Sequence, residues 1–405
     1  MPESIITDDQ QLRDYLNRHA NSTLVGFDTE FISEDTYRPE LCLIQVNSQQ
    51  DIALIDPLAI EDLTPFWKWL TDEDRTILVH AFREELRFIF QATGEAPRHL
   101  LDIQIAAAFV GLEYPASYGT LTGHLLKVKL GKGETRTDWR RRPLTPSQCE
   151  YARQDVKYLE PIYHLLIDQL SQQNRLDWML DEVDRQQTQI LMQTKGPRWR
   201  KISGSGSLNR RGLEIARRLW IWRDEIAAES NLPARRVLRD DLICELARRQ
   251  FASIEKLRQI RGMQHRQVQK RLPAIRDVIR QALDTPDNEC PERHRQSKSP
   301  QRATLSQFLY TAICDSCQRN DMAPGMVATM TDIRDYLDLT YGRSAASKKR
   351  QPLLNTGWRQ QFIEPLLQDI LCGRLVAHVT DPTSDQPLSF IPHSAINPKP
   401  AEHDL

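Results

Sequence analysis

Two acidic residues follow a short apolar run near the start of the chain. Residues 24–27 are Leu, Val, Gly and Phe, and Asp28 and Glu30 come next with Thr29 between them. The run predicts a buried strand that ends in two carboxylates. Because buried carboxylates repel one another and lose solvation, such a pair needs a cation, unless it merely caps a turn after the strand. Carboxylate oxygens suit Mg²⁺ or Mn²⁺, and two such ions about 3.5–4 Å apart catalyse phosphodiester hydrolysis.

Two further segments carry residues suited to the same chemistry. Tyr151 and Asp155 are four apart in a helical pattern, so they share a face and lie about 6 Å apart. Asp155 would be a third metal ligand, and the Tyr151 hydroxyl would orient or help to deprotonate the attacking water. The alternative for Tyr151 is a core aromatic with a satisfied hydroxyl. Glu84 and Glu85 follow another predicted strand and point in different directions, so only one of the two is expected to join the site.

The first 175 residues predict the elements that position these groups. Strands are expected at 24–31, 41–47, 52–55, 76–79 and, more weakly, near Leu100. The polar residues 48–50 separate the second strand from the third, which indicates a hairpin. Helices are expected at 63–70, 84–91, 103–110, 121–130 and 146–173. A hairpin followed by alternating strands and helices predicts an α/β domain with a mixed sheet.

The remainder of the chain predicts mainly helix. Residues 176–207 are expected to form a helical extension that ends in a flexible Ser-Gly link at 203–207. Residues 208–284 have apolar positions at helical spacing and indicate an all-α domain. A polar linker at 285–302 precedes a second helical domain at 303–380, and the proline-bearing tail at 381–405 is expected to be irregular.

The length, the cysteine content and the charge distribution of the chain limit its possible functions. A chain of 405 residues predicts two or three domains. We expect no membrane association and no obligatory protein partner, and seven scattered cysteines indicate a reducing, cytoplasmic location. Residues 5–170 hold 26 acidic and 17 basic side chains, whereas residues 208–283 hold 18 basic and 9 acidic ones. This division suits a polyanionic substrate, although arginine-rich helices also occur as ordinary solvated surfaces.

The motifs taken together resemble the ribonuclease D family, in the branch of the DEDD exonuclease superfamily that has a tyrosine in its third motif. TYRPELCLIQV (residues 36–46) resembles the family's second-strand segment. ETRTDW (134–139) and RPLT (142–145), with Gln148, Tyr151 and Asp155, resemble its third-motif block.

The helical part resembles the HRDC domain of the same family. The matching features in residues 208–283 are Pro233, RVL (236–238), DL (241–242) and IRG (260–262). A fainter resemblance of residues 303–372 to a second such domain rests mainly on GWR (357–359).

This resemblance implies an RNase H-like catalytic domain with HRDC helical domains that form a funnel over its site. It also implies a 3′–5′ exoribonuclease that releases 5′-mononucleotides from structured RNA, especially tRNA 3′ ends. The catalytic residues would be Asp28, Glu30, Glu85, Tyr151 and Asp155, with the four acids holding two divalent ions, Mg²⁺ or Mn²⁺. The family has an aspartate where this chain has Glu85, and a carboxylate misplaced by about 1 Å costs on the order of a hundredfold in rate.

Several residues are candidates for RNA contact. A basic cluster suited to phosphate precedes the helix of Tyr151 and consists of Lys132, Arg136, Arg140, Arg141 and Arg142. Phe31 is expected to stack near the terminal bases and Gln45 to contact the end of the RNA chain. For both residues, packing in the core or the sheet is an equal alternative.

Two other functions fit the same residues. A DNA exonuclease of the same superfamily would use the same metal chemistry, and no residue here identifies a reader of the 2′-hydroxyl. A non-catalytic RNA-binding protein would result if Glu85 had weakened the site. An assay on matched RNA and DNA separates these functions.

Overall fold

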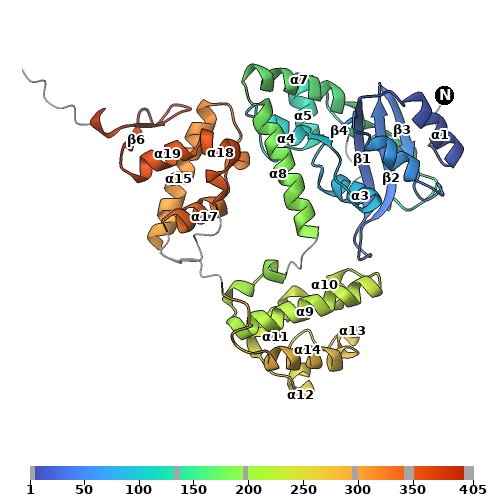
Figure 1. The fold of residues 1–405 in the computed structure, drawn as a ribbon, viewed down its shortest axis with the longest axis vertical. Coiled ribbons are helices and arrows are strands. Elements are labelled where there is room, and N and C mark those ends of the chain that lie inside the picture. Colours follow the sequence, from blue (N-terminus) through green and yellow to red (C-terminus); the bar gives the residue numbers. More distant parts are fainter. Residues whose placement is uncertain (1–4, 132–136, 195–198, 294–299, 342–350, 396–405) are drawn as a thin grey trace, which may run out of the picture.

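The computed structural model describes residues 5–131, 137–194, 199–293, 300–341 and 351–395. These form a sheet-containing N-terminal region, a helical module at 208–284 and a C-terminal helical region (Figure 1). Within the described residues, no helix combines the length and the apolar character that crossing a membrane requires.

A five-stranded mixed sheet forms the frame of the N-terminal region, in the order β3-β2-β1-β4-β5. Its strands are β1 (Leu24–Ile32), β2 (Glu40–Ser48), β3 (Asp51–Ile55), β4 (Thr76–Val79) and β5 (His99–Asp102). β2 is antiparallel to β1 and β3, whereas β1, β4 and β5 run parallel. Gln49 and Gln50, both at positive φ, form the predicted hairpin turn between β2 and β3. The mixed sheet and its five predicted strands are therefore confirmed.

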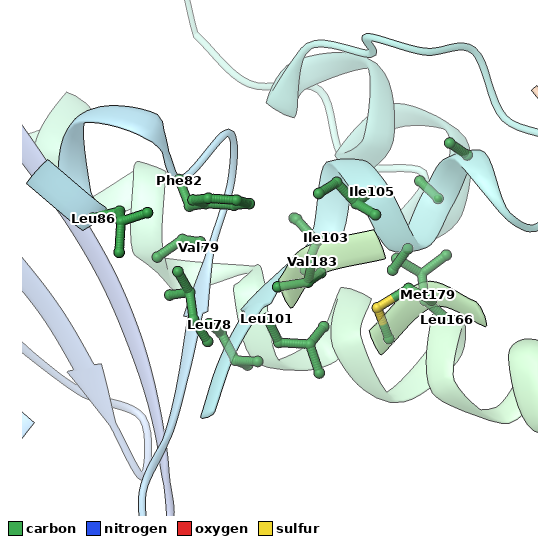
Figure 2. Packing of buried hydrophobic residues seen from close by; sticks show 14 of the residues in the cluster. Leu78, Val79, Phe82, Leu86, Leu101, Ile103, Ile105, Leu166, Met179 and Val183 are labelled. Carbon is green, nitrogen blue, oxygen red and sulfur yellow. The ribbon is translucent and has the colours of Figure 1, made fainter. Parts of the chain in front are cut away.

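Helices cover both faces of this sheet. α6 (Pro146–Lys157) lies across β1, β2 and β3, and α7 (Leu159–Gln172) lies on β1 and β4. On the other face, Phe27 of β1 packs edge-on against Trp67 of α2 (Thr64–Leu70), with ring centroids 6.3 Å apart. Figure 2 shows how Leu78, Leu101 and Val183 continue the core between the strands and the surrounding helices. These helices are α3 (Arg83–Thr93), α4 (Ile103–Ala108) and α8 (Leu176–Thr194).

Two predicted helices have the wrong ends, and helix α1 (Asp9–Arg18) is an addition to the predicted elements. The helix expected over 146–173 is interrupted at Tyr158, whose N–H donates to the Tyr118 hydroxyl (3.0 Å). Pro161 also has no N–H to donate to the carbonyl of Lys157. The helix expected over 121–130 consists of α5 (Tyr118–Leu121) and the π-helix η1 (Thr122–Leu126). It ends at Lys127, where the backbone turns left-handed at φ 57°.

The helical module has a hydrophobic core of its own. Its helices are α9 (Arg210–Glu229), α10 (Ala234–Val237), α11 (Asp240–Arg249), α12 (Ile254–Arg258), α13 (Arg266–Gln269) and α14 (Leu272–Asp284). Leu219, Ile243 and Ile279 are buried in a cluster separate from that of the sheet.

The Ser-Gly segment at 203–207 packs against this module, so the prediction of a flexible link is wrong. Ser205–Ser207 forms the 3-10 turn η3, and the Cys244 thiol donates to the Ser203 carbonyl (3.1 Å). Gly204 adopts φ +90°, a left-handed backbone conformation that favours glycine.

The C-terminal region packs on the N-terminal region and shares its hydrophobic core. It consists of α15 (Pro300–Arg319), α16 (Pro324–Val327), α17 (Met330–Tyr341), α18 (Gly357–Phe362), α19 (Glu364–Leu371), β6 (Leu375–Val379) and β7 (Leu388–Pro392). The ring of Trp358 lies 4.9 Å from that of Phe109 and 6.0 Å from that of Trp178. The predicted irregular tail is wrong at β7, which pairs antiparallel with β6. Pro387 precedes this strand and Pro392 is its last residue, so neither interrupts it.

Candidate active site

β1 places Asp28 and Glu30 at an open edge of the sheet. The two acids alternate with Thr29, so their side chains leave the same face of the strand. β4 pairs with β1 only as far as Gly26, and the register shifts between Glu30 and Phe31, which marks a β-bulge. Both acids are half-buried. The strand therefore presents two carboxylates that an ion can reach.

Helix α6 carries Tyr151 and Asp155 to the same place. A capping box between Thr145 and Gln148 fixes the start of the helix, with Pro146 in its first turn. Tyr151 and Asp155 lie one turn apart, and the phenol hydrogen-bonds the carboxylate. The ring of Tyr151 lies against buried Trp139, with centroids 6.1 Å apart.

A glycine allows α6 and β1 to approach each other. Gly26 lies on the same face of β1 as Asp28. A Cβ at this position would lie 3.2 Å from Leu159 Cδ1 and 3.3 Å from the Val156 carbonyl. A larger residue would push the junction of α6 and α7 away from the sheet, and Asp155 with it.

Asp28, Glu30 and Asp155 converge into one cluster. Each offers a carboxylate oxygen, and these oxygens all lie within 4.8 Å of one another. In the described part of the chain, no arginine, lysine or histidine forms an ion pair with any of the three. Three oxygen ligands at this spacing, without a cation from the protein, fit a divalent metal ion.

The pKa values of the three carboxyl groups are raised, because burial and mutual repulsion disfavour their charged forms. Burial, followed by the charges of Glu85, Asp155 and Glu30, raises the pKa of Asp28 well above its usual range. Burial and the charges of Asp155 and Glu85 raise the pKa of Glu30 to about 8. Burial raises the pKa of Asp155 to about 7, although a hydrogen bond from Tyr151 opposes the shift. A cation in the cluster would remove this repulsion.

Glu85 lies outside this group of converging oxygens, although its charge contributes to the raised pKa values of Asp28 and Glu30. It lies in the first turn of α3, is 5% exposed, and accepts a hydrogen bond from Thr29 Oγ1 (2.9 Å). Burial raises the pKa of Glu85 to about 7. Its neighbour Glu84 pairs instead with Arg87 (2.5 Å). The expected preference for Glu85 over Glu84 therefore agrees with their surroundings.

Asp102 is a positioning residue that sequence reasoning missed. It stands at the end of β5 and accepts hydrogen bonds from the backbone N–H groups of Ala81 and Phe82 (both 3.1 Å). Ala81 has φ 65°, and α3 begins two residues later. Asp102 thereby fixes the turn that presents Glu85. Its place at the end of a predicted strand was the available signal.

The structure contradicts one of the two RNA contacts predicted on the strands. Gln45 is wholly buried, so it cannot touch RNA as predicted. Phe31 is half-buried and packs against Phe88, with ring centroids 5.6 Å apart. Its exposed part leaves the stacking role of Phe31 a prediction.

The basic cluster divides in the same way. The five N–H donors of Arg142 are all engaged, with the Asp56 carboxylate and with the carbonyls of Cys42, Trp139 and Arg141. Arg142 is therefore a structural anchor, and the prediction that it contacts phosphate is wrong. Arg140 pairs with Asp35 (3.0 Å). Arg141 pairs with Asp138 at 3.7 Å, but its side chain is 85% exposed, so its contact with phosphate stays a prediction. Lys132 and Arg136 lie outside the described residues.

Comparisons with known proteins agree with this architecture. A family model described as 3′-5′ exonuclease matches residues 4–171, and an HRDC domain model matches residues 212–279. Ribonuclease D of Gluconacetobacter diazotrophicus is 30% identical to the chain, across 93% of this chain and 94% of that protein. Ribonuclease D of Xanthomonas oryzae pv. oryzae is 32% identical, across 90% of this chain and 98% of the relative.

A solved structure extends the likeness to three dimensions. The crystal structure of Escherichia coli RNase D, an exoribonuclease involved in structured RNA processing, superposes with a TM-score of 0.80 at 28% identity. The match covers 92% of this chain and 99% of that one. The exonuclease fold of this family is metal-dependent, which agrees with the carboxylate cluster. The chain therefore belongs to the ribonuclease D family of 3′–5′ exoribonucleases.

Proposed function

We propose that this exoribonuclease trims the 3′ ends of structured RNA, above all tRNA precursors, and releases 5′-mononucleotides with two Mg²⁺ or Mn²⁺ ions. One observation supports the proposal most strongly. Asp28, Glu30 and Asp155 bring their oxygens within 4.8 Å of one another, without a cation from the described residues. Asp28 would serve both ions, with Glu30 and Asp155 on one of them and Glu85 on the other.

The residues of the chain divide the chemistry between them. When bound, the ions supply a lowered pKa for the attacking water and positive charge for the leaving 3′ oxygen. Burial, followed by the charge of Asp155, raises the pKa of the Tyr151 hydroxyl, so the phenol keeps its proton at neutral pH. Tyr151 therefore does not act as the base. Because its O–H is donated to Asp155, its oxygen would orient the water as a hydrogen-bond acceptor.

Glu85 acts from a fixed position. Thr29 Oγ1 holds its carboxylate at 2.9 Å, and the backbone of α3 holds the other end of the side chain. The longer arm of glutamate is thus restrained in the direction of β1. This restraint favours an active enzyme over a degenerate RNA-binding protein.

The helical module meets the N-terminal region close to the proposed site. The Tyr37 hydroxyl donates to Asp224 on α9 (2.9 Å), and the Tyr37 N–H donates to Asn231 Oδ1 (3.2 Å). Tyr37 lies in the segment that follows β1, so an RNA held by the module would have its 3′ end near the carboxylates.

The grip of the module on RNA is weaker than its arginine content suggests. Arg217 and Arg218 both pair with buried Glu214, and Arg248 and Arg249 both pair with Glu245. Arg236 is exposed and has no ion pair with another described residue. We therefore propose that the module guides structured RNA through few phosphate contacts, and that salt weakens binding only moderately.

A nuclease assay tests this function. Purified protein is incubated with a 3′-labelled tRNA precursor and with matched RNA and DNA oligonucleotides, in Mg²⁺, in Mn²⁺ and in EDTA. We expect labelled 5′-mononucleotide from RNA in either metal and no release in EDTA. Release from DNA alone would replace the proposal by a DNA exonuclease, and no release in any metal would leave an RNA-binding protein.

All seven cysteines are free thiols in the structure. This supports the further proposal that the enzyme works in a reducing compartment, the cytoplasm.

A further inference from the structure

Gln45 is a buried polar side chain that lacks the partners such a group normally has. It is 0% exposed, and neither its Nε2 nor its Oε1 has a hydrogen-bond partner among the described residues. A buried amide without partners destabilises a fold, so its presence in the middle of β2 calls for a compensating role.

The register of the sheet places Gln45 beside Asp28. The two residues are directly opposite each other in the antiparallel pair of β1 and β2. Directly opposite residues point to the same face, with Cβ atoms about 4.5–5.5 Å apart. The glutamine side chain is long enough for its amide to reach the Asp28 carboxylate from the neighbouring strand.

The other neighbours of Gln45 on this face carry no charge, although Asn47 Oδ1 is also a buried acceptor without a partner among the described residues. Leu54 is its partner on β3, and Leu43 is the next residue along β2 on the same face. Asn47, on its other side, donates its own amide hydrogens to the carbonyls of Val156 (3.2 Å) and Lys157 (3.5 Å). Asp28 is therefore the acidic group that this amide is placed to serve.

We propose that Gln45 is a positioning residue whose side-chain amide donates a hydrogen bond to the Asp28 carboxylate when Asp28 holds a divalent ion. The inference rests on the proposed metal-dependent function. A metal-bound carboxylate is ionised and accepts hydrogen bonds, and such a bond fixes which oxygen faces the ion. The buried amide would thus be the hydrogen-bond partner of an Asp28 carboxylate that holds an ion.

The test measures metal binding and stability separately from turnover. Gln45→Leu removes the amide at nearly constant size, and Gln45→Met is a second variant with an unbranched side chain. Free Mn²⁺ is titrated by EPR at neutral pH, and Tm is measured in EDTA. We expect the Kd for Mn²⁺ to rise about 10–100-fold. We also expect the metal-free Tm to rise by about 2–4 °C, because an unsatisfied buried amide is lost.

A matched control uses another buried glutamine. Gln187 on α8 is 6% exposed, and its Oε1 also lacks a partner within the described residues. Gln187→Leu should leave the Kd for Mn²⁺ within about twofold of the wild-type value.

The outcomes separate this inference from the function it rests on. If both Gln45 variants bind Mn²⁺ as tightly as the wild type, or if Tm falls while the Kd stays constant, Gln45 is only a packing residue. If the wild type itself binds no Mn²⁺, the proposed metal-dependent function fails first.

Discussion

Two acidic sites in the described part of the chain are built in opposite ways. Glu182 on α8 is wholly buried and receives Arg185 (2.6 Å), Arg359 (2.7 Å) and the indole N–H of Trp358 (3.2 Å). Burial alone would raise its pKa, but hydrogen bonds from the two arginines lower the pKa of Glu182 to about 2. Asp28, Glu30 and Asp155 have no such cations among the described residues, and burial raises the pKa of each of them.

The contrast separates a structural acid from acids that are candidates for catalysis. Arg185 and Arg359 of the same chain neutralise Glu182. The contacts of Glu182 with Trp358 and Arg359 join α8 to α18 and thereby hold the C-terminal region on the N-terminal one. The described residues supply no counter-charge to the carboxylate cluster, which fits the proposed metal ions. Carboxylates whose pKa values are raised by burial, and which have no neighbouring cation, are therefore candidates for binding a ligand.

The largest expected effect comes from removing an acid of the unneutralised site. Asp28→Ala and Asp155→Ala should each lower turnover by about 10³-fold or more, because several kcal/mol of metal-dependent stabilisation of the transition state is lost. The measurement is nucleotide release from 3′-labelled RNA in Mn²⁺. Asp168→Ala, at an exposed aspartate of α7, is the control and should keep full activity. Full activity of Asp28→Ala would exclude the assigned site.

The paired site should respond in stability instead of turnover. Arg359→Leu leaves Glu182 buried beside a lost partner, and removing one partner of a buried ion pair costs about 3–5 kcal/mol. Urea unfolding measures this loss. The double variant Glu182→Leu/Arg359→Leu should recover much of it, because the two buried charges are removed together and the remaining Arg185 is 35% exposed.

A surface ion pair provides the comparison for this variant. Arg374 and Asp369 pair with both side chains well exposed, so Arg374→Leu should change stability little. If Arg359→Leu were equally mild, the Glu182 site would not be the anchor of the C-terminal region.

The two sites should also respond to pH in opposite directions. Glu30, Glu85 and Asp155 have folded pKa values raised to about 8, 7 and 7, so their neutral forms stabilise the metal-free fold below the unfolded pKa values. That stability is lost as the pH rises through about 7–8. The pKa of Glu182 is lowered to about 2, so its contribution is present above its unfolded pKa and is lost as the pH falls toward 2.

Metal exposes this difference experimentally. In EDTA, Tm should fall as the pH rises from about 5 to about 8. Saturating Mn²⁺ should remove most of that fall, because the ion binds the ionised carboxylates of the folded state. A Tm in EDTA that stays constant across this range would show that the cluster is less strained than its geometry indicates.

The same contrast explains what the sequence could predict. Asp28 and Glu30 follow an apolar run, and Tyr151 and Asp155 have helical spacing, so local pattern was enough to find them. The strands were equally accessible, because each is an apolar run bounded by polar residues. Helix α1 had a local signal too, in the cap from Asp8 to Gln11 and the spacing of its buried residues Leu12, Tyr15 and Leu16.

The features that escaped prediction depend on contacts distant in sequence. In the sequence Arg142 resembles a phosphate ligand, but in the fold its N–H groups donate to Asp56 and to the Cys42 carbonyl. Tyr158 ends a helix because a hydroxyl from Tyr118 takes its N–H. The pairing of Glu182 with Arg359 spans 177 positions and leaves no local pattern. Each of these requires the fold before it can be recognised.

The smallest expected effect lies at Glu85, which combines features of both sites. It is buried and has a raised pKa like the cluster, but a hydrogen bond from Thr29 restrains it. Glu85→Asp shortens the arm by one methylene and keeps the charge, so turnover in Mn²⁺ should stay unchanged or rise by up to about tenfold. Glu85→Ala should lower turnover by on the order of a hundredfold.

Glu182→Asp is the matched change at the paired site. There the same shortening moves a carboxylate away from Arg185 and Arg359, so stability should fall while turnover per folded molecule stays constant. The two substitutions are chemically identical, and only the surroundings differ. If Glu85→Asp were as inactive as Glu85→Ala, the longer side chain would be required, and the second ion would occupy a position built for glutamate.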